Sequence, residues 1–181
     1  HEGIATKELI PYTYPSDDEL SRAGVTGLFL GFYIPWDGYT NALIAQANGF
    51  TTYQRSVEGS IVNYENLDNH QTGIHDYFKF LKFGFGRATD LACLHIRRGR
   101  MTREDALTLV RRHDGAFPWN YLGKSLEAII QPLDITIDEF VRTCDRFTNK
   151  KLFLRDDKGN LIRDKDGNLT KVNYDNLTNQ T

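Results

Sequence analysis

The chain has 181 residues, of which 40% are hydrophobic and 12% aromatic, and its formal net charge is −2. This composition is typical of one folded domain with a core and excludes a wholly disordered chain. No apolar run is long enough to cross a bilayer, and the N-terminus lacks the basic start and apolar centre of a signal peptide. We therefore expect a cytoplasmic protein with no membrane partner.

The two cysteines and the first residue set the context of the chain. Cys93 and Cys144 lie far apart, each within a helical pattern, so neither a disulfide framework nor a C-x-x-C metal site is indicated. We expect buried free thiols in a reducing compartment. The sequence opens at His1 without an initiator Met, and we expect it to be a piece of a longer polypeptide.

Residues 1 to 37 predict a connector followed by one strand. The connector, 1–23, contains a short helix that begins at Ser16, with Glu19 completing a capping box. The apolar run 28–34 lacks alternating polar residues, which favours a strand buried on both faces of a parallel sheet. Trp36 and Asp37 then follow its carboxyl end, where open α/β sheets place ligands.

The rest of the chain predicts helices joined by one long loop. A short helix is expected at 41–48, and the polar stretch 51–72 predicts a long loop of a length that is often functional. From Gly73 apolar residues recur every three or four positions, with a kink or break at Gly84 and Gly86. Further helices begin at capping residues Thr102 and Thr136. The imperfect repeat 155–162 and 163–170 predicts a β-hairpin.

A basic cluster between Lys79 and Arg103 surrounds this pair of glycines. In an unbroken helix Lys82 and Arg87 would lie on different faces, but a break would let them converge. It would also free the backbone amides of Gly84 and Gly86 to bind a phosphate, with Asp90 orienting Arg87 or contacting a hydroxyl. The competing interpretation is a kinked core helix whose basic side chains face solvent.

Two other functions compete with an anion site. One is a metal-dependent phosphohydrolase of the HD type. Its candidate ligands are His70, His75 and Asp76, with Glu65 and Asp68 just before them and His95 and His113 later, although their spacing matches no strong ligand pattern. The basic cluster is also compatible with a helical module that binds an anion or a nucleic acid. The negative net charge and the lack of interleaved exposed aromatics weigh against nucleic acid as a partner.

Several motifs together resemble the C-terminal part of a known enzyme family. They are YIPWD (33–37), EGS and NYENLD (58–68), KFGFGRATD (82–90), IRRGRMTREDALTLVRRHDG (96–115) and DRFTNKKLF (145–153). This combination resembles the N-acetyl sugar amidotransferases of pseudaminic acid, legionaminic acid or lipopolysaccharide biosynthesis, in the ATP pyrophosphatase (PP-loop) superfamily. The implied fold is α/β: the C-terminal portion of a Rossmann-like PP-loop domain, mostly helical, with one buried parallel strand at about 28–34 and a C-terminal β-hairpin.

The resemblance also implies a reaction and its partners. The family uses ATP, with Mg²⁺, to activate the acetamido oxygen of a sugar substrate, and ammonia from a glutaminase partner then replaces that oxygen. The SGGxDS loop of the superfamily is absent from these residues, so we expect the piece alone to be inactive. Lys82 and Arg87 are the expected ligands of pyrophosphate or substrate phosphates. We expect Arg87→Ala in the complete enzyme to abolish amidination while leaving the fold intact.

The expected organisation has three parts. Residues 1–23 are a connector, 24–150 form the C-terminal half of the ATP pyrophosphatase-like domain, and 151–181 form the hairpin tail. The expected substrate-binding residues are Lys82, Gly84, Gly86, Arg87, Asp90, Trp36 and Asp37. No catalytic residue is assigned and no metal-ligating residue is expected.

Overall fold

The structure is a computed structural model that describes residues 5–172. The chain divides into two units, His1–Ile44 and Ala45–Thr181. This boundary falls inside α4 (Gly38–Ala47) rather than at residue 23. The tail after residue 150 belongs to the second unit, because Phe153 and Leu169 are buried in its core.

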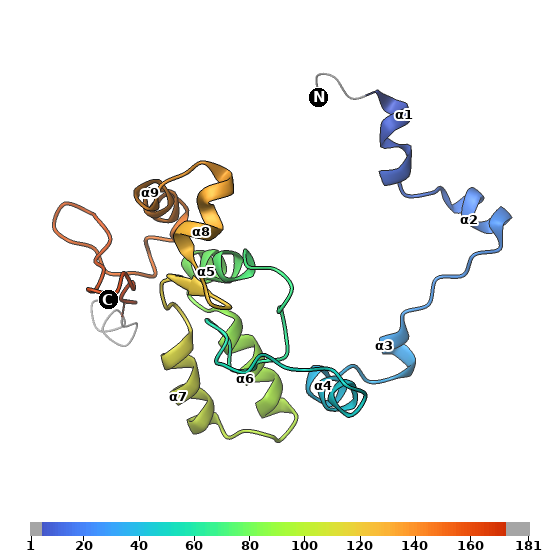
Figure 1. Ribbon diagram of the computed structural model, residues 1–181, viewed down its shortest axis with the longest axis horizontal. Helices are drawn as coiled ribbons and strands as arrows, with labels where there is room; N and C mark the ends of the chain where they lie inside the picture. The colour runs from blue at the N-terminus through green and yellow to red at the C-terminus, as the bar shows by residue number, and fades with distance from the viewer. Residues whose placement is uncertain (1–4, 173–181) are drawn as a thin grey trace, which may run out of the picture. The chain divides into compact units, whose positions relative to one another are not determined.

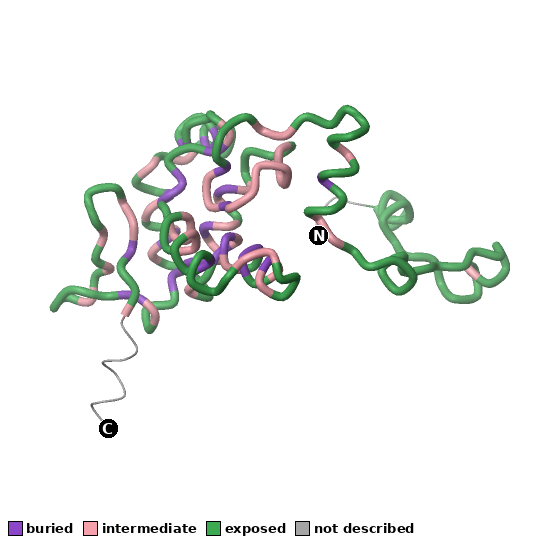
Figure 2. The backbone as a smooth tube through the Cα atoms, turned by 90° about the horizontal axis from the view of Figure 1, so that it is seen from below, coloured by how far each residue is buried: buried purple, intermediate pink, exposed green. Residues whose placement is uncertain are grey.

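The first unit consists of short helices whose side chains are largely exposed (Figure 2). As predicted, Ser16 and Glu19 form a capping box at the start of a helix, because each side chain bonds to the other's backbone N–H. The helical segments before α4 are α1 (Thr6–Leu9), η1 (Ile10–Tyr12), α2 (Asp17–Ala23) and α3 (Leu30–Tyr33).

The buried parallel strand expected at residues 28–34 is not found. Leu30–Tyr33 instead form the four-residue helix α3, and the side chains around it are exposed, Phe29 by 89% and Phe32 by 85%. A strand needs a neighbour to pair its backbone groups, and within the described residues the one ladder of paired strands lies at 120–125. The segment therefore satisfies its amides locally, as in the 2.9 Å bond from the N–H of Ile34 to the carbonyl of Leu30.

The second unit is a group of helices with one small antiparallel ribbon (Figure 1). The ribbon joins β1 (Asn120–Tyr121) and β2 (Lys124–Ser125), with Asn120 opposite Ser125. The elements after α4 are α5 (Thr72–Phe83), α6 (Arg87–Arg97), α7 (Arg103–His113), β1 (Asn120–Tyr121), β2 (Lys124–Ser125), α8 (Leu126–Ile130), η2 (Gln131–Leu133) and α9 (Ile137–Phe147).

The helix ends follow the local signals of the sequence. Gly84 adopts a left-handed conformation, with φ of 76°, and ends α5, so the glycine pair does break the helix. The side chain of Thr102 accepts a bond from the backbone of Asp105 at the start of α7. At α9, Thr136 and Glu139 complete the predicted capping box.

The core of the second unit is rich in aromatic side chains. It is formed by α5, α8, α9, the segment after α7 and the tail, and buries Tyr77, Phe80, Leu81, Phe117, Leu126, Ile130, Phe140, Cys144, Phe153 and Leu169. A smaller cluster of Val57, Tyr121 and Ile129 fixes the long loop against β1 and α8. The loop 51–71 contains no helix or strand, but a backbone bond from the N–H of Tyr53 to the carbonyl of Asn63, at 2.9 Å, joins two of its parts.

Two smaller expectations have different outcomes. Cys144 is buried as predicted, but Cys93 lies on the exposed face of α6. No helix among the described residues is long and apolar enough to span a membrane.

The tail contains two turns, closed by antiparallel bridges between Arg155 and Leu161 and between Arg163 and Leu169. Its last residues, 173–181, lie outside the described range.

Candidate functional site

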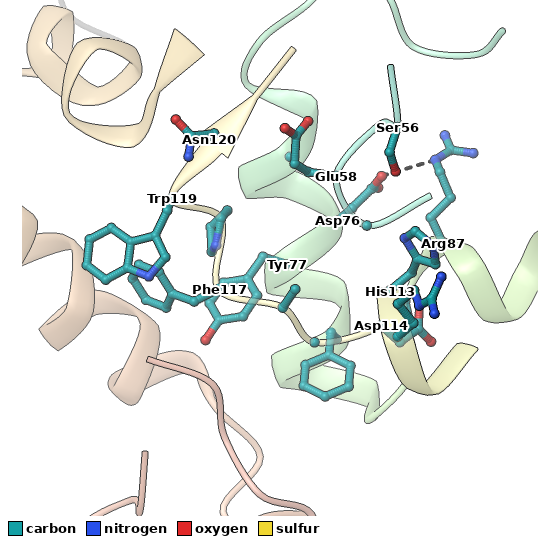
Figure 3. Close-up of a pocket in the computed structure, with 18 residues that line it drawn as sticks. Ser56, Glu58, Asp76, Tyr77, Arg87, His113, Asp114, Phe117, Trp119 and Asn120 are labelled. Atoms are coloured by element: carbon teal, nitrogen blue, oxygen red, sulfur yellow. Dashed lines mark hydrogen bonds and ion pairs between the residues drawn. The ribbon is translucent and has the colours of Figure 1, made fainter. Parts of the chain in front are cut away.

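A pocket of about 290 Å³ opens in the second unit (Figure 3). Its walls come from the long loop, α5, the start of α6, the last turn of α7 and the segment that follows α7. The lining residues are Ser56, Glu58, Gly59, Gly73, Asp76, Tyr77, Phe80, Gly86, Arg87, Arg112, His113, Asp114, Gly115, Ala116, Phe117, Pro118, Trp119 and Asn120. Three carboxylates and four aromatic rings are among them, so one side is polar and the other apolar.

Asp114 occupies the N-terminus of α6. Its Oδ2 accepts a bond from the backbone N–H of Gly86 at 2.8 Å and another from the hydroxyl of Thr89. A carboxylate is the group that the positive end of a helix favours. The amide that the sequence predicted for a phosphate is therefore already bound by the protein's own anion. A Cβ at Gly86 would lie 2.7 Å from Oδ1 of Asp114, so a larger residue at this position would displace the carboxylate.

The second oxygen of Asp114 has no such partner. Oδ1 is buried and accepts no hydrogen bond from the described residues. A buried carboxylate oxygen without a donor costs free energy. A donor that reached this oxygen from a bound molecule would remove that cost.

The aromatic wall is built on close contacts. The rings of Phe117 and Trp119 lie 4.5 Å apart between centroids, and Tyr77 packs edge-on to Phe117 at 5.4 Å. In Figure 3 these three rings lie on one side of the pocket, and Arg87, His113 and Asp114 on the other. The indole N–H of Trp119 donates to the carbonyl of Asp166 at 2.6 Å, which ties this wall to the tail.

Arg87 is held by carboxylates from two elements. Its Nε donates to Oδ2 of Asp76 at 3.0 Å, and Nη1 donates to Oε2 of Glu65 at 3.3 Å. The Asp76 side chain is only 12% exposed, so its ion pair with Arg87 is shielded from solvent. Arg87 therefore connects α6 to α5 and to the long loop, and its charge is balanced within the protein.

Two lining residues have displaced pKa values. Burial, with a smaller effect of the adjacent Arg112, lowers the pKa of His113 below its usual value. Burial raises the pKa of Tyr77 to about 12, against the opposing effect of Arg163. At neutral pH we therefore expect a neutral imidazole and a protonated phenol at this site.

The break between α5 and α6 does not bring the predicted basic residues to one ligand. Nζ of Lys82 lies 5.4 Å from the ring centroid of Phe147 in α9, whereas Arg87 contacts Asp76. Asp90 forms an ion pair with Lys79 rather than orienting Arg87. Of the residues predicted around the break, only Gly86 and Arg87 line the pocket.

Trp36 and Asp37 belong to the first unit, and every lining residue of the pocket comes from the second. Asp37 serves as a local cap: its Oδ1 accepts from the backbone N–H of Tyr39 at 3.2 Å, and Oδ2 accepts from the hydroxyl of Thr40 at 3.1 Å. Trp36 is 73% exposed.

The sequence did not assign Glu58, Asp114, Phe117 or Trp119 to a site. Two local signals could have pointed to them. Glu58 lies in the long polar loop, and the other three lie in or just after the His-Asp-Gly sequence at the end of α7. The histidines considered as metal ligands do not gather, because residues 5–172 contain no cluster of three or more His, Cys, Asp or Glu that could hold a metal.

The arrangement defines a class of site. A concave pocket with aromatic walls and a few convergent polar groups is typical of sites for small polar molecules. Carboxylates and a neutral imidazole accept hydrogen bonds from hydroxyl and amide groups, and arginine donates them.

The family of the chain agrees with a role in sugar metabolism. Residues 48–165 match the family described as LPS biosynthesis protein WbpG-like, C-terminal domain. The match covers more than half of the chain and contains every residue that lines the pocket. The chain belongs to this family, whose description places it in lipopolysaccharide biosynthesis. A search of curated proteins found no match.

Proposed function

We propose that this chain is the C-terminal part of an ATP-dependent N-acetyl sugar amidotransferase and that its pocket holds the sugar substrate. Membership of the WbpG-like family supports the setting in lipopolysaccharide biosynthesis. The combination of YIPWD, KFGFGRATD and the helix after Thr102 supports the finer assignment of the reaction. Under this proposal the longer domain has the Rossmann-like PP-loop fold.

The observation that carries the proposal is the pairing of an aromatic wall with carboxylates in one pocket. Phe117 and Trp119 form one side, and Asp76 and Asp114 lie across from them with Glu58. A pyranose ring presents C–H faces that pack on aromatic rings, and hydroxyl and N-acetyl groups that need acceptors and donors. The pocket offers both kinds of contact at the scale of one small molecule.

The same residues do not fit the phosphates of ATP. The lining contains three carboxylates, Glu58, Asp76 and Asp114, against two guanidinium groups. One of these groups, Arg87, is already paired with Asp76 and Glu65. Like charges close to a phosphate are repulsive, so we assign no step involving the nucleotide to this pocket.

The complete reaction needs components that the chain does not itself provide. The proposal includes ATP with Mg²⁺ bound by the longer protein, and ammonia delivered by a glutaminase subunit. The acetamido C–O bond breaks as a C–N bond forms with ammonia, and the oxygen leaves with AMP. Asp76 and Asp114 would orient the sugar for this exchange rather than take part in it.

Binding of N-acetylated sugars tests the pocket. Saturation-transfer NMR with N-acetylglucosamine, N-acetylmannosamine and glucosamine should show contacts for the acetylated sugars and weaker ones for the amine. Glu58→Gln should weaken that binding about tenfold, the loss expected for one hydrogen bond to a charged group. Glu127→Gln, on the exposed side of α8, is the matched control. If the Glu58 variant bound each of the three sugars as tightly as the wild type does, the assignment of the pocket would be contradicted.

The reaction itself is tested in the longer polypeptide. With ATP, Mg²⁺, ammonium chloride and an N-acetylated sugar, AMP and pyrophosphate should form only when the sugar is present. The product should contain NH in place of the acetamido oxygen, which mass spectrometry detects. If the longer polypeptide bound the sugar without this turnover, the pocket would still be a sugar-binding site, but the amidotransferase reaction would be ruled out.

A further inference from the structure

The C-terminal tail contains the same unit twice. Residues 155–161 and 163–169 share the pattern R-D-x-x-G-N-L. In both copies the aspartate N–H donates to the asparagine carbonyl, at 2.9 and 3.0 Å, and the asparagine side chain donates to Oδ2 of the aspartate at 3.0 Å. The glycines have φ values of 85° and 87°. The two copies therefore present equivalent groups on the same kind of turn.

The second copy shows what such a unit recognises, because it is docked on the aromatic wall of the pocket. Oδ1 of Asn168 accepts from the backbone N–H of Phe117 at 2.7 Å, and the carbonyl of Asp166 accepts from the indole of Trp119 at 2.6 Å. The ring of Phe117 covers Gly167, since a Cβ there would lie 3.1 Å from the ring. The bound segment is thus an aromatic residue, a proline and a tryptophan in succession.

The arginine of the second copy adds two further contacts. The guanidinium carbon of Arg163 lies 5.8 Å from the ring centroid of Phe117, and the guanidinium pairs with the carboxylate of Asp145. A cation over an aromatic face is attractive. The surface that receives the unit therefore offers an aromatic ring, an indole donor and a carboxylate.

The first copy has the same recognition groups without a partner among residues 5–172. The carbonyl of Lys158 and Oδ1 of Asn160 are the counterparts of the two docked acceptors, and neither accepts a hydrogen bond from these residues. A Cβ at Gly159 would meet nothing within 4 Å, so no ring covers this glycine. Arg155, the counterpart of Arg163, is exposed and forms no ion pair with the described residues.

An open hollow of about 450 Å³ lies beside the first copy, and Gly159 is part of its lining. A ring placed over Gly159, as Phe117 lies over Gly167, would enter this hollow. The lining also contains the cations Lys150, Lys151 and Arg155. Both carboxylate oxygens of Asp156 accept bonds within the turn. The cations therefore face mainly Asp157, and the hollow favours an acidic partner.

We propose that residues 155–161 bind a short segment of a different protein, in which an aromatic residue, a proline and a tryptophan follow one another and an acidic side chain lies close by. The backbone N–H of the aromatic residue donates to Oδ1 of Asn160, the indole donates to the carbonyl of Lys158, and the ring covers Gly159. The acidic side chain pairs with Arg155.

The structure favours a different protein over a second copy of this chain as the occupant. The Phe117–Trp119 segment of a second copy is already held by that copy's own residues 163–169. Binding it would first require the tail of the second copy to leave the core, where Leu169 is buried. A segment of another protein carries no such cost.

Fluorescence polarisation with a labelled peptide tests this surface. The peptide copies residues 114–121, DGAFPWNY, and so carries the recognised segment and one acidic residue. The wild-type chain should bind it saturably. A peptide with phenylalanine in place of tryptophan keeps a ring but lacks the indole donor, and should bind about tenfold more weakly. Asn160→Ala should weaken binding by a similar factor and Arg155→Gln severalfold, whereas Lys165→Ala, in the docked copy, should bind as the wild type.

Three results would each overturn the proposal: no saturable binding by the wild type, equal binding of the two peptides, or equal binding by Asn160→Ala and the wild type. The peptide substitution leaves the chain unchanged, so it remains informative even if Asn160→Ala disturbs the tail. Sedimentation velocity checks the occupant. A chain that is dimeric, and that the peptide dissociates, would assign the surface to a second copy and overturn its assignment to a different protein.

Discussion

Oδ2 of Asp114 lies 2.8 Å from the backbone nitrogen of Gly86, so the residue that follows α7 caps the start of α6. The two residues are 28 positions apart in the chain. This one contact joins two walls of the pocket, because both residues line it. It also explains why the helix N-terminus, which the sequence predicted for phosphate, is already occupied.

Loss of the Asp114 charge should destabilise the fold. Asp114→Asn keeps one acceptor oxygen but removes the negative charge at the start of α6. We expect the free energy of unfolding to fall by about 1–2 kcal/mol, measured by urea denaturation. Asp157→Asn, exposed in the tail, should change it by less than about 0.5 kcal/mol. Equal effects of the two substitutions would contradict the capping role.

Substitutions at Gly115 and Gly99 measure the energetic cost of placing a side chain where the Phe80 ring approaches the backbone of Gly115. Both have positive φ, 80° and 67°, but a Cβ at Gly115 would lie 2.2 Å from the Phe80 ring, whereas none of the neighbours of Gly99 is within 4 Å. Gly99→Ala should cost about 1 kcal/mol of backbone strain. Gly115→Ala should cost about 2–4 kcal/mol because Phe80 must also move. Similar urea midpoints for the two variants would show that Phe80 adapts freely.

Arg87→Ala should now affect stability as well as any activity. Removing the guanidinium takes away the ion pair between Arg87 and the shielded Asp76 carboxylate, and releases Glu65 in the long loop. We expect a loss of about 1–3 kcal/mol, below that of a fully buried pair because Arg87 is partly exposed. Arg97→Ala, at the exposed end of α6, is the control. An unfolding free energy unchanged by Arg87→Ala would restore the expectation that the fold stays intact.

The local features of this protein could be predicted and the distant ones could not. Ser16 with Glu19, Thr136 with Glu139 and the stop at Gly84 depend on residues within one turn of helix, so the sequence shows them directly. The prediction of a strand at 28–34 was wrong, because an apolar run does not by itself provide a neighbouring strand with which to pair. Likewise, no spacing in the sequence indicates that Asp114 bonds to the backbone of Gly86 or that Trp119 bonds to the tail.

His113 should make stability depend on pH below neutrality. Its pKa in the folded state is lowered, so the unfolded chain binds the proton more readily. Stability is then fully present above the unfolded value of about 6.5 and falls as pH drops through it towards the folded pKa. Urea denaturation between about pH 7 and 5 should show a smaller decline for His113→Gln than for the wild type. His70→Gln, on the exposed loop, should retain the wild-type decline.

Arg163 should decide whether the tail stays docked. Its guanidinium donates to the hydroxyl of Tyr77 at 3.1 Å and to the carbonyl of Gly167 at 2.8 Å, and it pairs with Asp145. We expect Arg163→Gln to speed proteolytic cleavage of the tail severalfold. Arg155 holds the same position in the first copy of the repeat, where it is exposed. Arg155→Gln should therefore leave the cleavage rate unchanged, and equal rates for both variants would exclude the anchoring role.

The two cysteines differ in exposure, and this difference allows one of them to be labelled selectively. Burial raises the pKa of Cys144 to about 12, and its side chain has no exposed surface. Cys93 lies on the outer face of α6 and is not among the residues that line the pocket. Because thiolate formation and access govern alkylation, a maleimide dye should attach at Cys93 alone. These 181 residues are thus suited to single-site fluorescent labelling without any engineered substitution.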